Sequence, residues 1–248
     1  MADDDFRKLN LPIPIKFIVI LIIVFILIIV LIYFLFLQGS KKESEEKIMD
    51  QQEIILPQPQ KSSNTSIEES LLKRRSIREY KDEPLTITEI SQILWAAQGI
   101  TAPESGSRTA PSAGALYPLE VYLIVRKVEN FEPAVYKYLP KDHKLNKILK
   151  SDISGELIKV AQDFVSQAPA ILVFSGVFER TTQKYGERGI RYVYMEAGHA
   201  AQNVYLQAQS LGLGTVTVGA FSDEEFKKIL NLPEEETPLY IMPIGKIK

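Results

Sequence analysis

The hydrophobic pattern begins with one uninterrupted apolar run. Residues 17–37 (FIVILIIVFILIIVLIYFLFL) contain no charged residue, proline or glycine. At about 1.5 Å per residue, a helix of this length spans about 30 Å, which is the thickness of the hydrocarbon core of a bilayer. A signal peptide has a shorter apolar region, and no small-residue cleavage site follows here. The run therefore predicts a transmembrane helix, with a short tail over residues 1–16 before it.

The next segment is polar. Residues 38–65 mix charges of both signs with proline, serine and asparagine, which predicts a linker without a fold of its own. Residues 54–56 (IIL) are its one apolar cluster and could dock on the following domain as a strap. Lysine and arginine flank the apolar run on both sides, so the positive-inside rule does not decide the orientation in a membrane.

From Ser66 onward the pattern is that of one globular domain, over residues 66–248. Capping boxes at Ser66–Glu69 and Thr86–Glu89 predict that helices begin there. Apolar residues recur at helical spacing over residues 188–211, and Ser222 begins a last short helix. Apolar runs predict strands over residues 120–128, 170–177, 214–219 and 239–244. This alternation predicts an α+β fold, an α/β sandwich in which helices flank one mixed sheet.

Composition narrows the chemistry. The 29 basic and 31 acidic residues give a net charge of −2, so nucleic acid is not an expected partner. The absence of cysteine excludes disulfides, thiolate metal sites, iron–sulfur clusters and a cysteine nucleophile. The only histidines are His143 and His199, and the Glu196-x-x-His199 spacing occurs once, so we expect His199 to be a packed or hydrogen-bonded helix residue near the site, and we expect no metal. Redox chemistry would then require an organic cofactor.

A basic motif follows the first predicted helix of the domain. Arg74, Arg75 and Arg78 surround Ser76 within five residues. Arginine suits a phosphate monoester because its guanidinium donates two parallel hydrogen bonds. The alternative is that these cations only complement the helix C-terminus or lie in solvent.

Three further motifs could approach a flat ligand. Residues 108–118 (RTAPSAGALYP) are rich in small residues and precede a strand, so they form either a ligand loop or an ordinary strand entry. The nucleophile elbow of a serine hydrolase is disfavoured, because it needs a strand before it and a helix after it. Residues 211–220 lead from a helix into a strand and lack the spacing of a Rossmann or P-loop motif. Gly245-Lys246 could add a cation.

Together and in this order, these motifs resemble the nitroreductase superfamily of FMN proteins, over the whole of residues 66–248. The resemblance implies that the basic motif holds the FMN phosphate and ribityl chain, that the small-residue loop lines the isoalloxazine ring, and that the helix-to-strand turn approaches the ring near N5. The cofactor-binding residues it implies are Arg74, Arg75, Ser76, Arg78, Pro111, Ser112, Ala113, Gly114, Tyr117, Leu213, Gly214, Thr215 and Lys246.

Within the superfamily the chain is most similar to the azoline dehydrogenase (SagB/ThcOx-type) branch. The resemblance lies in residues 112–118, 136–138 and 196–203, and in Lys184-Tyr185. That branch includes enzymes that oxidise thiazolines and oxazolines in peptides, and a Lys-Tyr pair is implicated in their chemistry. Lys184 and Tyr185 are therefore the candidate catalytic residues, because a Cα proton must leave as hydride passes to the flavin. The alternative is that both are ordinary surface residues.

These observations predict a membrane-anchored, FMN-dependent oxidoreductase that transfers hydride through flavin N5, with NAD(P)H as a possible electron donor. The alternatives are an azoline peptide dehydrogenase and a tethered flavin-binding module without catalysis. The substrate is then a small molecule or a peptide, and the resemblance implies a homodimer that shares two FMN sites. A domain that uses cytosolic flavin and reductant favours a single-pass membrane protein with its domain in the cytoplasm.

Overall fold

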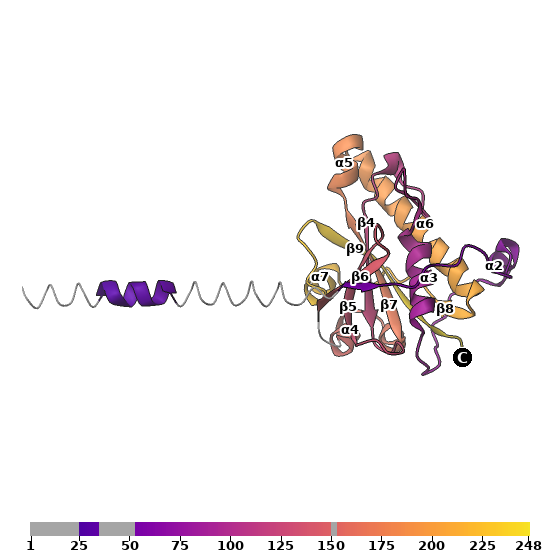
Figure 1. The fold of residues 1–248 in the computed structure, drawn as a ribbon, viewed down its shortest axis with the longest axis horizontal. Coiled ribbons are helices and arrows are strands. Elements are labelled where there is room, and N and C mark those ends of the chain that lie inside the picture. Colours follow the sequence, from indigo (N-terminus) through magenta and orange to yellow (C-terminus); the bar gives the residue numbers. More distant parts are fainter. Residues whose placement is uncertain (1–24, 35–52, 150–152) are drawn as a thin grey trace, which may run out of the picture. The chain divides into compact units, whose positions relative to one another are not determined.

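The computed structural model describes residues 25–34, 53–149 and 153–248. The chain divides into two compact units, Met1–Asp50 and Gln51–Lys248. In the second unit, helices and strands alternate along the chain, and the colours in Figure 1 follow this order.

The predicted transmembrane helix is wrong. Residues 25–34 are helical. The rest of the predicted span, residues 17–24 and 35–37, lies outside the described residues, as do the tail 1–16 and residues 38–52 of the predicted linker. Within the part that the structure describes, no helix combines the length and the apolar character that crossing a bilayer requires. The predicted membrane localisation, with a cytoplasmic domain, rested on that helix and is overturned with it.

The second unit is built on a seven-stranded sheet. The strand order is β1-β6-β5-β4-β7-β9-β8, and each neighbouring pair runs antiparallel. Among the described residues, parallel pairing is confined to the isolated bridges Ser76↔Thr215 and Leu85↔Val128. The strands are β1 (Glu53–Ile55), β4 (Leu119–Val125), β5 (Ala134–Leu139), β6 (Lys144–Leu149), β7 (Ala170–Val177), β8 (Leu213–Thr215) and β9 (Glu236–Lys246), with a separate hairpin of β2 (Ile100–Ala102) and β3 (Ser107–Arg108).

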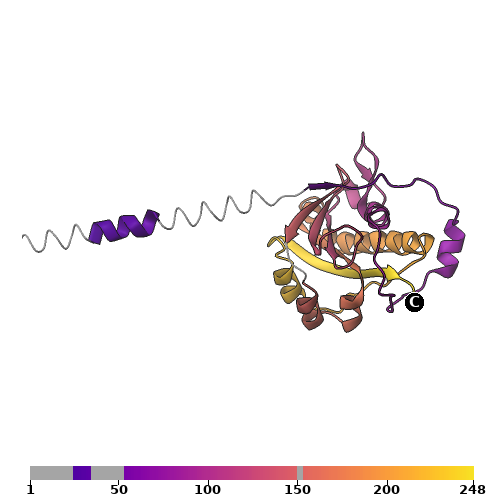
Figure 2. The same ribbon diagram turned by 60° about the horizontal axis from the view of Figure 1, so that its bottom comes forward.

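Helices cover both faces of the sheet. They are α2 (Ile67–Lys73), α3 (Ile87–Gln98), α4 (Ser154–Val160), α5 (Glu179–Tyr185), α6 (Arg188–Ser210) and α7 (Asp223–Ile229), with 3-10 turns at Ala113–Ala115 and Asp163–Gln167. Successive residues of a strand point to opposite faces. In β4, Leu123 therefore joins the core under α3 and α6, while Tyr122 and Ile124 join the core under α4 and α7. Figure 2 shows α6 extended beside the sheet.

The α+β sandwich predicted from the sequence is confirmed in this unit, although its named strands all pair antiparallel and, among the described residues, the sheet is mixed only through the isolated parallel bridge of Ser76 to Thr215 in β8. The helices predicted after Thr86 and over residues 188–211 are present as α3 and α6, and α3 begins with the full capping box. Strands β5 and β6, the β2–β3 hairpin and α5 were not predicted. The apolar cluster of residues 54–56 docks on the domain: β1 pairs with β6, and Leu56 is 2% exposed.

Candidate functional site

Tertiary structure brings the basic motif next to the helix-to-strand turn. Ser76 forms a parallel bridge with Thr215, and the Ile77 N–H donates to the Thr215 carbonyl at 3.0 Å. The Ser76 hydroxyl lies 3.1 Å from the hydroxyl of Tyr205 on α6. Two segments about 140 residues apart therefore meet across the end of α6. Together they line a cavity of about 220 Å³ whose walls include Arg74, Arg75, Tyr205, Gln209, Leu213 and Thr215.

The electrostatics of this cavity favour an anion. The Arg74 guanidinium lies 5.1 Å from the centre of the Tyr205 ring. Burial acts to raise the pKa of Tyr205, but hydrogen bonds from Ser76 and Thr217 and the charge of Arg74 bring it below its ordinary value. Thr215 lines the cavity, and its buried hydroxyl has no hydrogen-bond partner among the described residues. This arrangement can hold a phosphate.

Not every residue of the basic motif is free for such a role. Arg75 donates to the carbonyls of Leu72 and Arg74 at 3.0 and 2.7 Å, as expected of a cation that complements a helix C-terminus. The Arg78 guanidinium lies 5.7 Å from the ring centre of Phe164, outside this cavity.

Two other predicted cofactor residues have intramolecular partners. Lys246 pairs with Glu89 at the start of α3. At Gly214, an added Cβ would lie 2.7 Å from a methyl group of Ile77. The side chain that packs against the Gly214 backbone is therefore Ile77 of the same domain. Leu213 and Gly214 are buried.

The predicted ring-side loop, residues 111–117, has a strained backbone. Gly114, Ala115 and Tyr117 have φ of 65°, 55° and 46°. Positive φ is unfavourable for residues other than glycine and persists only where the surroundings enforce it. Ser112 enforces it locally, because its carbonyl accepts from the Ala115 N–H at 3.1 Å and its hydroxyl accepts from the Tyr117 N–H at 2.9 Å.

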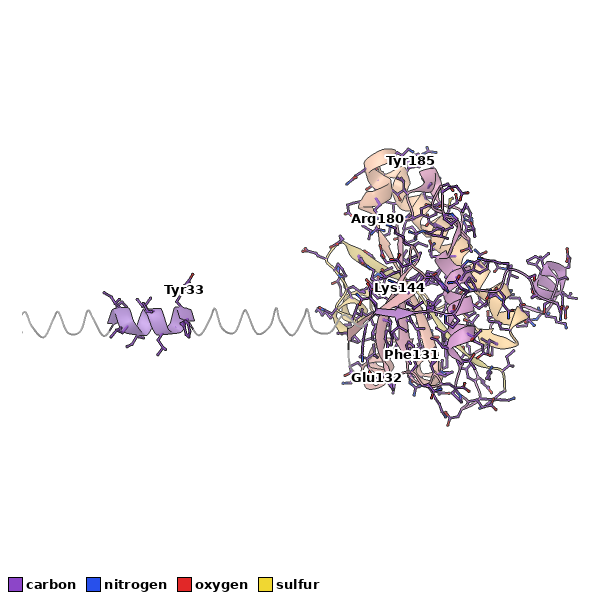
Figure 3. The ribbon with its side chains drawn as sticks, viewed as in Figure 1. Tyr33, Phe131, Glu132, Lys144, Arg180 and Tyr185 are labelled. Carbon is purple, nitrogen blue, oxygen red and sulfur yellow. The ribbon has the colours of Figure 1, made fainter. Side chains whose placement is uncertain are left out.

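The candidate catalytic pair lies against this loop. Lys184 and Tyr185 end helix α5, and a Cβ added to Gly114 would lie 2.9 Å from the Lys184 Nζ and 2.7 Å from the Tyr185 hydroxyl. The Tyr185 ring also packs edge-on against Tyr192, with centres 5.2 Å apart. Helix α5 is held in place by Arg180, which donates to the Tyr117 carbonyl at 3.2 Å and pairs with Glu120. Figure 3 shows Arg180 and Tyr185 at the same end of the domain.

The glycine at position 114 is therefore expected to be required by the site. In a Gly114→Ala variant, the alanine must keep a positive φ that is unfavourable for it. Its methyl group also collides with Lys184 and Tyr185, so both side chains must move. We expect a loss of stability of about 1 kcal/mol and a crystal structure in which the pair is displaced. A Gly106→Ala variant is the matched control, because Gly106 also has a positive φ but no atom within 4 Å of an added Cβ. Equal behaviour of the two variants would contradict this account.

A buried polar cluster under the loop was not predicted as part of the site. Glu196 on α6 is 2% exposed, and Gln98 at the end of α3 is fully buried. Arg108 donates to the Gln98 amide oxygen at 3.0 Å and lies 4.5 Å from the ring centre of Tyr117. Burial raises the pKa of Glu196 to about 7, against the opposing effects of Ser112, Arg108 and Gln98. One feature of the sequence could have indicated this cluster, because Arg108 and Glu196 both lie in motifs that the sequence analysis names.

His199, by contrast, is exposed, so it is not the packed residue that was one of the two expected alternatives. Because α6 advances 3.6 residues per turn, His199 lies on a different side of the helix from the buried Ala197 and Ala201. In the described ranges, no group of three or more histidine or acidic side chains is placed to hold a metal ion.

The two halves of the candidate site lie at different points along α6. Ser76 contacts Tyr205, whereas Ser112 acts on Glu196 by lowering its pKa. Nine residues of helix separate the two, which is about 14 Å along the axis. In Figure 1, α5 and α2 lie near opposite ends of α6.

Comparison with known proteins identifies the family. The family model described as the nitroreductase family matches residues 71–246. A protein of Methanocaldococcus jannaschii named as a nitroreductase is 51% identical over 199 residues, covering 79% of this chain and 98% of that protein. The microcin B17-processing protein McbC of Escherichia coli is 30% identical, covering 66% and 63%. An FMN reductase [NAD(P)H] of Bacillus subtilis is 29% identical, covering 71% and 64%.

Solved structures also relate the chain to nitroreductases. A nitroreductase-type protein of Ralstonia eutropha superposes with a TM-score of 0.71 at 30% identity, covering 80% of this chain and 91% of that chain. A chain of the E. coli microcin synthetase McbBCD complex, with truncated pro-MccB17 bound, superposes with a TM-score of 0.61 at 28% identity, covering 82% and 80%. The resemblance to the nitroreductase superfamily and to its SagB/ThcOx-type branch is confirmed. The protein is an oxidoreductase that belongs to the nitroreductase family.

Proposed function

We propose that this protein is an FMN-dependent oxidoreductase that accepts electrons from NAD(P)H. The observation that carries the proposal is that Arg74 and Thr215 line one cavity at the end of α6, where Ser76 forms a bridge with Thr215. The relationship to the FMN reductase [NAD(P)H] of Bacillus subtilis supports the choice of cofactor and donor.

The residues of this cavity fit the phosphate end of FMN. Arg74 supplies a positive charge, and the Thr215 hydroxyl is a buried donor without a partner among the described residues. In this proposal Arg74 and Ser76 bind the phosphate, and the loop of residues 111–117 excludes water from the ring. When bound, FMN would supply two-electron hydride chemistry at its N5.

The proposal is tested on the purified full-length protein. We expect it to be yellow, with a flavin absorbance band that NADPH or NADH bleaches under anaerobic conditions. An Arg74→Ala variant should lose most of its flavin, while an Arg188→Ala variant, which removes an exposed arginine at the far end of α6, should retain it. A colourless protein that takes up no added FMN would overturn the proposal. A flavin that no donor reduces would favour a binding module.

A second candidate, an azoline peptide dehydrogenase, is favoured by the position of Lys184 and Tyr185. Both side chains lie against Gly114 of the ring-side loop, where a base would be needed to remove a substrate proton. The similarity to the microcin B17-processing protein and to a chain of its synthetase complex also supports this candidate. Bleaching of the flavin by a thiazoline peptide, and not by NAD(P)H, would select it.

The role of the pair is tested by replacing Lys184. A Lys184→Ala variant is expected to bind flavin normally and to lose turnover on the order of 10²–10⁴-fold, the usual contribution of a general acid or base. The matched control is Lys159→Ala, which removes an exposed lysine near the end of α4. Turnover and flavin content are measured together, and unchanged turnover in Lys184→Ala would exclude the role.

We further propose that two copies of the chain associate. Exposed apolar side chains lie on α2 (Leu71 and Leu72, 55% and 73% exposed) and on α6 (Tyr194 and Met195, 55% and 51%). Such patches favour burial against a partner. A homodimer would also bring a second copy of each half-site near α6, in keeping with the separation of the two halves within one chain. Light scattering on a size-exclusion column should give twice the chain mass of 28.1 kDa.

A further inference from the structure

Helix α5, which ends in the candidate catalytic pair, cannot hold its position by itself. It has seven residues, and its N-terminus has no side-chain cap. A helix this short is not stable in isolation and depends on contacts with the rest of the domain. Its backbone packs closely on α6, because a Cβ added to Gly189 would lie 2.8 Å from the Thr182 nitrogen. That contact holds α5 on α6, and a different contact must hold it on the ring-side loop.

The Arg180 guanidinium makes this second contact. One terminal nitrogen donates to the Tyr117 carbonyl at 3.2 Å, and the other lies 2.5 Å from the Glu120 carboxylate. In the described part of the chain, no other side chain of α5 forms a hydrogen bond or an ion pair with another element. One guanidinium therefore connects α5 both to the ring-side loop and to strand β4.

Arg180 and Lys184 lie on the same side of α5. They are four residues apart, and this spacing places two side chains one above the other on a helix. Arg180 contacts the ring-side loop at Tyr117, and Lys184 lies against it at Gly114. Loss of the Arg180 contact would therefore release the same face of the helix that presents Lys184 to the loop.

The contact also supports the strained backbone of Tyr117. This residue has a φ of 46°, which is unfavourable and must be enforced by its surroundings. Its N–H donates to the Ser112 hydroxyl at 2.9 Å, its ring stacks on the Arg108 guanidinium at 4.5 Å, and its carbonyl accepts from Arg180. Of these three contacts, only the one from Arg180 comes from α5. The strained loop and the short helix therefore hold each other through Arg180.

The other acceptor, Glu120, is fixed by the sheet. Its Oε1 pairs with Arg180, and its Oε2 pairs with Lys137 of β5 at 3.2 Å. Lys137 pairs in turn with the buried Glu236 at 3.1 Å. A single exposed ion pair contributes little, whereas a network with fixed members can hold a geometry. The Glu120 side chain is only 15% exposed, so Arg180 binds to an acceptor that is itself held in place.

We propose that Arg180 is a positioning residue of the active site, which clamps α5 to the Tyr117 carbonyl and the Glu120 carboxylate and so holds Lys184 and Tyr185 in place. Arg180 acts through that pair, so the inference rests on the proposed role of the pair in the reaction. The clamp requires a guanidinium, because its planar fork presents two nitrogens to two acceptors at once, whereas a lysine offers a single nitrogen.

The first test replaces Arg180 by lysine in the full-length protein, which keeps the charge and removes the fork. Turnover should fall roughly 10–100-fold, as expected when reacting groups are misplaced, with KM and flavin content little changed. The midpoint of urea unfolding should stay where it is, because the Arg180 side chain is 42% exposed and such ion pairs add little stability. Arg188→Lys makes the same change at an exposed arginine in the first turn of α6 and should alter none of these quantities.

A second measurement reports the position of the pair without using activity. The NMR signal of ¹³Cζ-labelled Tyr185, assigned from a Tyr185→Phe variant, should be displaced in Arg180→Lys. It should also be displaced in Glu120→Gln, which keeps the shape of the acceptor and removes its charge. The signal of Tyr138, which is buried beside His143 in another part of the core, should be unchanged in both variants. A Tyr185 signal that stays in place in both variants would overturn the clamp.

A third test asks whether Arg180 acts through the pair. In a protein that already carries Lys184→Ala and Tyr185→Phe, Arg180→Lys should cause no further loss of turnover, because residues that act as a unit are not additive. An equal loss in both backgrounds would overturn the positioning role. If Lys184→Ala leaves turnover unchanged while Arg180→Lys still displaces the Tyr185 signal, the clamp on α5 is supported and the proposed role of the pair is overturned.

Discussion

A Glu236→Ala variant is expected to be less stable than the unaltered protein by about 3–5 kcal/mol, the usual cost of breaking a buried ion pair by removing one partner. Glu236 begins β9 and is 2% exposed. Its carboxylate accepts from the Tyr122 hydroxyl at 2.9 Å, from Ser175, and from the Lys137 ammonium at 3.1 Å. The variant leaves three buried or half-buried polar groups without this acceptor. Urea unfolding followed by circular dichroism measures the loss.

The neighbouring acid is a matched control. Glu235 is exposed, and a Glu235→Ala variant should change the unfolding free energy by less than about 0.5 kcal/mol. The network also reaches the candidate site, because Lys137 pairs with Glu120 at 3.2 Å and Glu120 pairs with Arg180 of α5. Equal stability of the two variants would show that the carboxylate of Glu236 does not hold these strands together.

The second large effect is a pH-dependent stabilisation by Glu196→Gln. Burial raises the pKa of Glu196 from 4.5 to about 7 in the folded chain, so the folded state binds this proton more tightly than the unfolded state does. The stability that this proton contributes is fully present below pH 4.5 and is lost as the pH rises through 7. At 1.36 kcal/mol for each pKa unit, the loss is on the order of 3 kcal/mol.

The variant has no such proton to lose. At pH 5, Glu196→Gln and the unaltered protein should unfold at similar urea concentrations, whereas at pH 8 the variant should be more stable by up to about 3 kcal/mol. A Glu104→Gln variant, in the exposed β2–β3 connection, should track the unaltered protein at both pH values. A constant difference between Glu196→Gln and the unaltered protein across this range would contradict the assignment. A more stable but slower enzyme would fit a site that keeps a costly group for its function.

Strong local patterns were sufficient for part of the fold. Helix α3 followed from a capping box and an apolar face, and β7 from an unbroken apolar run that is buried along its whole length. Strands β5 and β6 were missed because lysine and asparagine interrupt them, and they are strands because they pair with β4 and with each other. The apolar run of residues 17–37 had the composition of a membrane span, but in the part of the chain that the structure describes no helix is both long and apolar enough to cross a bilayer.

The sequence by itself determined the family, because its four motifs keep their order along the chain. It also determined the residue types available for chemistry, since a chain without cysteine has no thiol, disulfide or cysteine-ligated iron–sulfur cluster for redox work. Only the tertiary structure decided which residues work together. Ser76 meets Thr215, Gly114 meets Lys184, and Lys246 is taken up by Glu89. The burial of Glu196 was equally hidden, because its neighbours Arg108 and Ser112 lie more than 80 positions away and desolvation arises only when such distant segments pack.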